Sequence, residues 1–257
     1  MNRINQLLQQ KKSGILDIYF CAGYPQLDST IPTLEALERG GIDMVEIGIP
    51  FSDPMADGPV IQTAATQALK NGMTLSLLFK QLKDIRKSVS IPLILMGYLN
   101  VIYQYGFEKF CQSCRQCGID GAIIPDLPFD EYIEQYKAIA DKYNINIIML
   151  ITPETSEERI RLIDDNTDGF IYEVSTDATT GAQKEYGEAT IAYFRRIHNM
   201  KLKNPTLIGF GISNKATLSV TREYAAGAII GSKFIRLTTE SHNIEEALQK
   251  LYKALQE

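Results

Sequence analysis

The sequence predicts an α/β fold, a single-domain (β/α)8 barrel (TIM barrel) that takes up residues 1–257 and carries an extra helix at its N terminus. Short runs rich in β-branched residues alternate with amphipathic helical patterns, and such alternation requires parallel strand pairing. Eight strand–helix units in 257 residues match the size of a closed barrel. An open doubly wound sheet is disfavoured, because no G-x-G-x-x-G follows the first strand and no linker divides the chain.

Each predicted strand is a short, largely apolar run, and each predicted helix carries apolar residues at helical spacing. The predicted strands are Leu16–Cys21, Met44–Ile49, Pro92–Gly97, Gly121–Pro125, Ile145–Ile151, Gly169–Val174, Thr206–Phe210 and Gly227–Gly231. The helical segments between and after them are Ile31–Arg39, Leu75–Lys87, Phe107–Cys117, Glu131–Lys142, Ser156–Asp165, Ala189–His198, Lys215–Tyr224 and Ile244–Leu255.

The spacing of the strands predicts two long loops. Strand starts are separated by roughly 28, 48, 29, 24, 24, 37 and 21 residues, whereas a plain strand–helix unit needs about 25 to 30. The extra residues follow the second and sixth strands, at Pro50–Pro59 and Ser175–Gln183. Both loops follow the carboxyl ends of strands, where barrel enzymes hold their catalytic groups. We expect them to act as lids, with neutral surface insertions as the alternative.

Composition and charge disfavour several classes of function. The 26 Lys and Arg against 31 Asp and Glu give a net charge of −5, which disfavours binding to nucleic acid or to anionic membranes. No run approaches the about 18 consecutive apolar residues that span a bilayer, and the N terminus lacks the apolar segment of a signal peptide. Four cysteines do not form a disulfide scaffold, so we expect a soluble cytoplasmic protein.

Cys111, Cys114 and Cys117 have a C-x2-C-x2-C spacing that resembles an iron–sulfur motif. They lie within a predicted helix, in which residues three apart drift around the axis and cannot converge on one metal ion. No fourth cysteine follows, and Cys21 belongs to a different element. We therefore expect these side chains to pack as small hydrophobic groups, and we expect no metal site.

Glu46 is the candidate catalytic group of the second strand. Side chains alternate between the two faces of a strand, so Glu46 and Gly48 are expected to point into the barrel while Ile47 packs under the helices. No predicted strand contains Lys or Arg, so no strand neighbour can neutralise Glu46. Burial without a cation raises the pKa of a carboxyl group, which suits a group that both gives and takes a proton near neutral pH.

The alternative for Glu46 is a structural role, in which hydroxyls such as that of Tyr172 hold it by hydrogen bonds. If Tyr172 faces inward, Glu173 has the opposite parity and is expected to face the helix layer.

A second carboxyl group, Asp57, follows eleven residues later in a loop rich in proline and glycine that could cover the barrel mouth. Two carboxyl groups in different surroundings can divide the work, one exchanging protons and the other staying ionised beside a developing positive charge. Asp53 and Asp57 could instead be turn-forming residues, which is common for Asp beside Pro or Gly. Spacing alone leaves both interpretations open.

Glycines at the ends of the last two strands predict a phosphate site. They lie in Gly209–Ser213 and Gly227–Ser232, where they let backbone N–H groups approach an anion. A short helix starting at Ser232 would point its N terminus at the same anion, and Lys233 could add charge. Tight turns explain the glycines equally well. Neither histidine lies near the predicted barrel mouth, which argues against a serine hydrolase or a histidine-bound metal.

Residues 46–62, EIGIPFSDPMADGPVIQ, closely resemble the signature motif of the tryptophan synthase alpha subunit family. Further segments match in order over nearly the whole chain: Ala22–Pro25, Met96–Asn100, Pro125–Pro128, Thr180–Ala182, Gly209–Ser213 and Gly231–Ser232. The resemblance implies a (β/α)8 lyase of tryptophan biosynthesis. Such an enzyme cleaves indole-3-glycerol phosphate by a retro-aldol step into indole and D-glyceraldehyde 3-phosphate.

By position, the resemblance makes Glu46 the general acid–base and Asp57 the partner of the indole N–H. Tyr172 would lie beside Glu46, and Thr180 would contact Asp57 when the lid closes. The indole pocket would be lined by Tyr19, Tyr98, Leu99, Pro125, Leu127 and Ile151. The phosphate would be held by Gly181, Phe210, Gly211, Gly231 and Ser232.

The resemblance also implies a partner, a PLP-dependent beta subunit that receives indole through a tunnel in an alpha-beta-beta-alpha heterotetramer. Asp53 and Pro54 would lie at that interface, and the alpha chain itself would need no cofactor. Two positions depart from the family. The lid reads Ala-Thr-Thr-Gly at residues 178–181 where Gly-Val-Thr-Gly is usual, which narrows its backbone freedom. Lys233 stands where a small residue is common.

Two other functions fit part of this pattern. Another phosphate-binding barrel, such as a sugar-phosphate isomerase or epimerase, would share the glycines but would not require Glu46 together with the Asp57 loop. A non-catalytic regulatory subunit would bind indole-3-glycerol phosphate and control a partner. The presence of both carboxyl groups argues against this second alternative.

Overall fold

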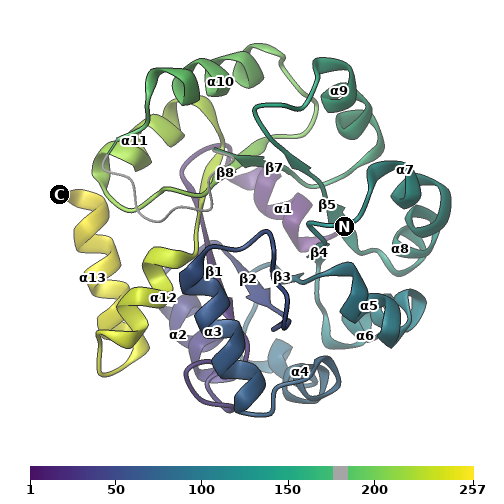
Figure 1. Cartoon of the computed structure of the whole chain (residues 1–257), viewed down its shortest axis with the longest axis vertical. Helices are drawn as coiled ribbons and strands as arrows, with labels where there is room; N and C mark the ends of the chain where they lie inside the picture. The colour runs from purple at the N-terminus through teal and green to yellow at the C-terminus, as the bar shows by residue number, and fades with distance from the viewer. Residues whose placement is uncertain (176–184) are drawn as a thin grey trace.

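Parallel strands form the centre of the computed structural model, which describes residues 1–175 and 185–257 (Figure 1). They are β1 (Ile15–Cys21), β2 (Met44–Gly48), β3 (Leu93–Met96), β4 (Gly121–Ile123), β5 (Asn146–Ile148), β6 (Leu150–Ile151), β7 (Ile171–Val174), β8 (Thr206–Gly209) and β9 (Gly227–Ile230). Hydrogen bonds join them in the order β5-β4-β3-β2-β1-β9-β8-β7-β6, and every pair is parallel. Helices surround this ring in Figure 1, which confirms the predicted barrel.

The predicted fifth strand consists of two strands, which corrects the expectation of eight. β5 pairs with β4, β6 pairs with β7, and only Met149 separates the two. Strands of a closed barrel are staggered, so one strand meets its two neighbours at different residues. The run Ile145–Ile151 therefore passes its hydrogen bonding from one neighbour to the other across Met149, and the continuous chain closes the ring.

The helices are α1 (Arg3–Gln10), α2 (Thr30–Arg39), α3 (Pro59–Lys70), α4 (Leu75–Leu82), α5 (Leu99–Tyr105), α6 (Phe107–Cys117), α7 (Phe129–Glu131), α8 (Lys137–Tyr143), α9 (Glu157–Asn166), α10 (Glu188–Asn199), α11 (Lys215–Tyr224), α12 (Ser232–Thr239) and α13 (Ile244–Gln256). None of the helices in the described part of the chain is long and apolar enough to cross a membrane.

Two of these helices, α3 and α5, lie outside the predicted helical segments, and two predicted helices are interrupted. The segment Leu75–Lys87 is α4 followed by a 3-10 turn, and Glu131–Lys142 covers the last residue of α7, a π-helical stretch and most of α8. Helix α3 has readable signals, because Pro59 occupies its first turn and its buried residues recur at helical spacing. It lies in the long interval after β2, which therefore holds a helix as well as a loop.

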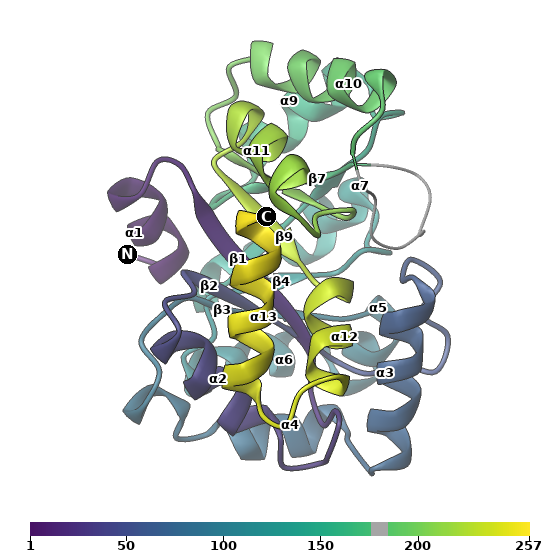
Figure 2. The ribbon, with the colours of Figure 1, turned by 90° about the vertical axis from the view of Figure 1, so that its left-hand side faces the viewer.

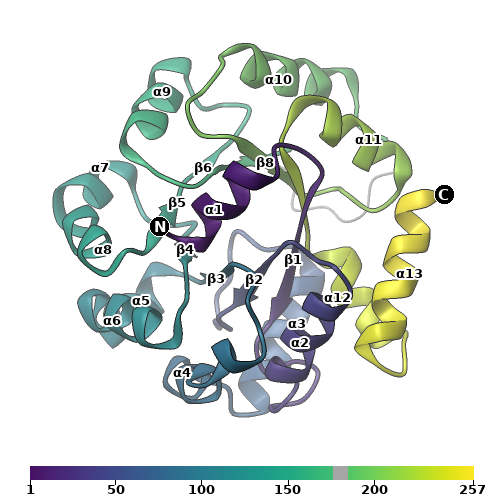
Figure 3. The same cartoon turned by 180° about the vertical axis from the view of Figure 1, so that it is seen from behind.

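The predicted N-terminal helix is α1, which covers one end of the barrel (Figure 3). The Asn2 side chain accepts a hydrogen bond from the Ile4 N–H (2.9 Å) and donates one to the Asp120 carbonyl (2.6 Å). The buried Asp120 carboxylate also pairs with Arg3 (3.0 Å) and Arg86 (2.6 Å). Figure 2 shows α1 and α3 on opposite sides of the molecule. These contacts stabilise the α1 end and leave the opposite end for binding and chemistry.

Cys111, Cys114 and Cys117 are all buried and unpaired on α6. The Cys117 thiol contacts the carbonyl of Phe79 (3.5 Å). Packing as small hydrophobic side chains is therefore confirmed for these cysteines.

Candidate active site

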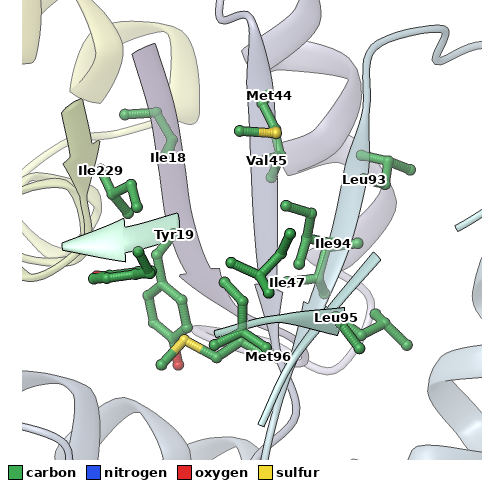
Figure 4. Close-up of a cluster of buried hydrophobic side chains, with 14 of the residues drawn as sticks. Ile18, Tyr19, Met44, Val45, Ile47, Leu93, Ile94, Leu95, Met96 and Ile229 are labelled. Atoms are coloured by element: carbon green, nitrogen blue, oxygen red, sulfur yellow. The ribbon is translucent and has the colours of Figure 1, made fainter. Parts of the chain in front are cut away.

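A pocket opens at the carboxyl ends of the strands, where enzymes of this fold bind their substrates. It contains about 650 Å³ of empty space, including its open mouth. Figure 4 shows Tyr19 and Met96, two of its lining residues, among the buried apolar side chains of the neighbouring strands. Eight predicted site residues line the pocket: Tyr19, Glu46, Asp57, Tyr172, Phe210, Gly211, Gly231 and Ser232.

Glu46 lies on β2 between Tyr19 of β1 and Ile94 of β3, and it lines the pocket from inside the barrel. Its side chain is 1% exposed, and neither carboxyl oxygen receives a hydrogen bond from the described residues. The expected bond to the Tyr172 hydroxyl in the structural alternative is not formed. Burial raises the pKa of Glu46 well above its usual range, and the nearby Asp17 carboxyl raises it further.

Asp17 of β1 is a neighbour of Glu46 that was not identified from the sequence. No cation among the described residues acts on Glu46, but a second acid lies on the same inner face. Asp17 is fully buried, and burial raises its pKa to about 8. The inward direction of Asp17 could have been predicted from the sequence, because the alternation that points Tyr19 into the barrel points Asp17 inward as well.

Asp57 lies in the loop after β2 with its side chain buried in the pocket wall. Tyr98 Oη donates a hydrogen bond to Asp57 Oδ2 (3.0 Å), whereas Oδ1 receives none from the described residues. The Gln62 amide donates to the Asp57 carbonyl (2.8 Å) and fixes the loop. Burial raises the pKa of Asp57 to about 6, although the Tyr98 bond opposes this rise. Asp57 is thus mostly ionised at neutral pH and keeps one free acceptor, which a simple turn residue would not need.

Two buried tyrosines fill the barrel interior, and each lies against a glycine. A Cβ atom on Gly48 would overlap the Tyr19 hydroxyl, and one on Gly209 would overlap the Tyr172 hydroxyl. Burial raises the pKa of both tyrosines, so both hydroxyls stay protonated. Glu173 faces the opposite way, toward Tyr and Arg side chains of α10, in agreement with the predicted parity.

The chain turns sharply after β8, at the end of the pocket where phosphate is expected. Phe210 has φ 68° and Gly211 has φ 76°, a conformation that is strained for a bulky residue such as Phe. The Phe210 carbonyl accepts hydrogen bonds from Ser175 Oγ (2.9 Å) and Tyr186 Oη (3.1 Å). These two bonds hold the strained turn in place beside the pocket.

Helix α12 begins at Ser232, directly after Gly231, as predicted. The N–H groups of its first turn have no acceptor within the helix, so they are available to an anion. Lys233 lines the pocket, a position that the sequence alone did not determine. The turn after β8, the start of α12 and Lys233 lie together at one end of the pocket, where the phosphate site is predicted; we call this the anion-binding end.

Other predicted contacts lie away from this cavity. The pocket lining in the described part of the chain does not include Tyr98, Leu99, Pro125, Leu127 or Ile151. Tyr98 acts on the site through its bond to Asp57, and the Leu99 N–H is held by Asp126 (2.8 Å). Thr180 and Gly181 lie outside the described residues. The role of these residues in binding indole or phosphate stays a prediction.

Several lining residues received no role from the sequence. They are Gly58, Ile61, Met96, Ile212, Ser213 and Ile229. Gly58 and Ile61 belong to the start of α3, which was not among the predicted helices. The others lie within or directly after predicted strands, so inward parity and position at the strand ends could have identified them.

The tip of the loop after β2 is exposed beside the pocket. Asp53 is exposed and Pro54 half-buried, and the next residue, Met55, is 89% exposed. A single exposed apolar side chain is common on protein surfaces, so the interface at Asp53 and Pro54 stays a prediction.

A family model described as tryptophan synthase alpha chain matches residues 4–257. The chain belongs to the tryptophan synthase alpha chain family. It is 65% identical to the tryptophan synthase alpha chain of Phocaeicola vulgatus over 99% of both chains. It is 61% identical to that of Bacteroides thetaiotaomicron over 99% of this chain and 100% of the relative.

Solved structures of the family share this fold. The alpha chain from Legionella pneumophila superposes with a TM-score of 0.88 at 31% identity, covering 99% of this chain and 96% of that one. The A-subunit from Pyrococcus furiosus gives a TM-score of 0.86 at 35% identity, with 95% and 98% covered. Membership of the family makes this chain a lyase component of tryptophan synthase that works with a beta subunit. It also decides against a sugar-phosphate isomerase or epimerase.

Proposed function

We propose that this chain cleaves indole-3-glycerol phosphate into indole and D-glyceraldehyde 3-phosphate, with Glu46 as the proton-transfer group and Asp57 as the partner of the indole N–H. The observation that carries the proposal is the contrast between two carboxyl groups in one pocket. Burial holds the pKa of Glu46 well above its usual range, whereas it raises the pKa of Asp57 only to about 6. Burial thus favours the acid form of Glu46, while Asp57 can ionise near neutral pH, as the two roles require.

The reaction then needs only these two groups. Protonated Glu46 gives its proton to indole C3, and the ring nitrogen takes up positive charge beside the ionised Asp57. The Glu46 carboxylate next removes the proton of the hydroxyl on the adjacent side-chain carbon. The O–H electrons form the aldehyde, the carbon–carbon bond breaks, and its electrons restore the neutral indole ring. Glu46 ends the cycle protonated, as it began.

The anion-binding end would hold the substrate phosphate. Its backbone N–H groups at the start of α12 and the Lys233 ammonium suit a dianion, and together they would orient the glycerol chain toward Glu46. The proposal includes a PLP-dependent beta subunit as the receiver of indole, an alpha-beta-beta-alpha assembly, and no cofactor in this chain. The exposed loop tip at Asp53–Met55 would contact that partner. Unpaired cysteines fit the cytoplasm as the compartment.

The test is the release of indole from indole-3-glycerol phosphate by the purified chain. We expect slow release by the chain alone and faster release when a beta subunit is added. Tight binding of the substrate with no indole, even in the complex, would support the regulatory-subunit alternative and overturn the proposal.

Lys233→Ala is expected to weaken substrate binding. Loss of one cation from the phosphate site should raise KM and the dissociation constant of glycerol 3-phosphate about tenfold, which corresponds to about 1.4 kcal/mol. kcat should change little, because the phosphate does not react. Lys215→Ala is the matched control, since Lys215 is an exposed cation at the start of α11 and does not line the pocket. Equal KM values for both variants would contradict the role of Lys233.

A further inference from the structure

Asp17 and Glu46 form a buried pair of carboxyl groups below the pocket. Asp17 lies on β1 opposite Met44, two residues before Glu46 on the neighbouring strand β2. Asp17 is fully buried, and Glu46 is nearly so. Asp17 is absent from the pocket lining, whereas Glu46 is part of it. The pair therefore has one member that can reach substrate and one that cannot.

None of the four carboxyl oxygens has a donor at hydrogen-bond geometry among the described groups. The backbone N–H groups of Ile18 and Glu46 lie close enough to the Asp17 carboxyl to lower its pKa, but burial outweighs them. The two side chains come from neighbouring strands, two residues out of register and on the same inner face, and each shifts the pKa of the other. A carboxylate offers only acceptors, so the bond between them exists only when one of them carries a proton. Two unprotonated carboxylates at this depth would repel each other without compensation.

The groups that face the pair cannot replace that proton. Tyr19 on β1, Tyr172 on β7 and Asp57 in the loop after β2 are its titratable neighbours inside the barrel. Asp43, just before β2, is a carboxylate that also acts on Asp17, and it pairs with Lys11 (2.7 Å). On the flanking strands β9 and β3, the residues in register with Asp17 and Glu46 are Ile229 and Ile94. No cation is among the described groups that act on the pair.

We propose that Asp17 is a positioning residue for Glu46, and that a proton carried by one of the two carboxyl groups joins them across the β1–β2 pair, which orients Glu46 and keeps its acid form available to the substrate. This inference rests on the proposed function only for the role of Glu46 in proton transfer. The shared proton is a property of the free protein and can be measured without substrate.

The experiment combines infrared spectroscopy of the free protein with pH profiles of the reaction. The carbonyl band of a buried carboxylic acid is followed against pH in the wild type, Asp17→Asn, Asp17→Leu and Glu173→Gln. Glu173 is the matched control, because it is equally buried but faces the helix layer. We expect Glu173→Gln to lose only the part of the acid band that comes from Glu173. Asp17→Asn should lose the part that comes from the Asp17–Glu46 pair, because the new amide donates to an ionised Glu46.

The kinetic signature follows from the same change. An amide at position 17 stabilises the Glu46 carboxylate, so its pKa falls and the alkaline limb of the kcat profile moves to lower pH. We expect a shift of at least about one pH unit, or about a tenfold loss of kcat on that limb, with KM within about twofold of the wild type. Asp17→Leu removes the acid without adding a donor, so its limb should lie between those of the wild type and Asp17→Asn.

The outcomes separate the two proposals. An unchanged acid band and an unchanged alkaline limb in Asp17→Asn would overturn the shared proton, as would a change in KM alone. If Asp17→Asn does not fold, Asp17→Leu takes its place in both measurements. The acid band of Glu173→Gln, which keeps Asp17, is then the reference for the intact pair. Asp17→Asn could lose the acid band while Glu46→Gln keeps full activity. This result would support the shared proton and overturn the proposed function.

Discussion

Replacing Glu46 by Gln is expected to abolish the release of indole from indole-3-glycerol phosphate. Gln cannot give or take the proton at indole C3 and at the side-chain hydroxyl, and loss of a general acid–base typically lowers the rate by about 10² to 10⁴. We expect a loss at the upper end of that range, because the same group performs both transfers. The measurement is kcat for indole formation by the purified chain, with and without a beta subunit.

The fold should survive this substitution, because Gln has nearly the shape of Glu and its amide can donate to Asp17. Glu173→Gln is the control for removing an equally buried carboxyl group that faces away from the pocket. It should retain near-native turnover. A Glu46→Gln protein that is folded and turns over at the wild-type rate would show that another group moves the proton.

Replacing Asp57 by Asn is expected to lower kcat by about 10²-fold, the usual cost of removing one group that stabilises a developing charge. Its effect on the pH profile is equally diagnostic. The reaction needs ionised Asp57, whose pKa burial raises to about 6, so wild-type activity should rise as the pH increases through about 6. Asn does not titrate, so this acid limb should disappear from the residual activity while the alkaline limb from Glu46 remains.

Asp126→Asn is the control for Asp57→Asn, because Asp126 is an exposed carboxylate that caps α5 near the same end of the barrel. Its kcat and its acid limb should match those of the wild type. An acid limb that persists in Asp57→Asn would assign that titration to a different group and would remove the evidence for an ionised Asp57.

Local patterns were sufficient for most of the fold. The alternation of apolar runs with helical spacings predicted the strands to within a few residues, because burial on both faces of a parallel strand leaves a continuous apolar signal. Division of the fifth strand at Met149 was not predicted, since it depends on the stagger of its two neighbours. Helix α3 was missed for a different reason, namely that its start lies inside a loop motif rich in Pro and Gly.

The candidate site was predicted where strand parity and chain order are informative. Strand parity predicted that Glu46 points inward and Glu173 outward. Chain order predicted glycines directly after the last two barrel strands. Five predicted contacts, including Leu127 and Ile151, do not line the observed pocket. Their side-chain directions depend on how α5, α7 and the fifth barrel strand pack, which no local pattern contains.

The amino-acid sequence by itself determined the barrel, the inward position of Glu46 and the glycines after the last two barrel strands, because these follow from periodicity and from chain order. Only the tertiary structure decided that Asp17 lies beside Glu46, that Lys233 lines the pocket, and that Asp57 keeps one buried oxygen without a donor. Each of these is a relation between elements distant in the chain. Such relations arise when the ring closes and sets the strand register. They control the charge of a buried group, because without water its pKa depends strongly on each neighbouring group.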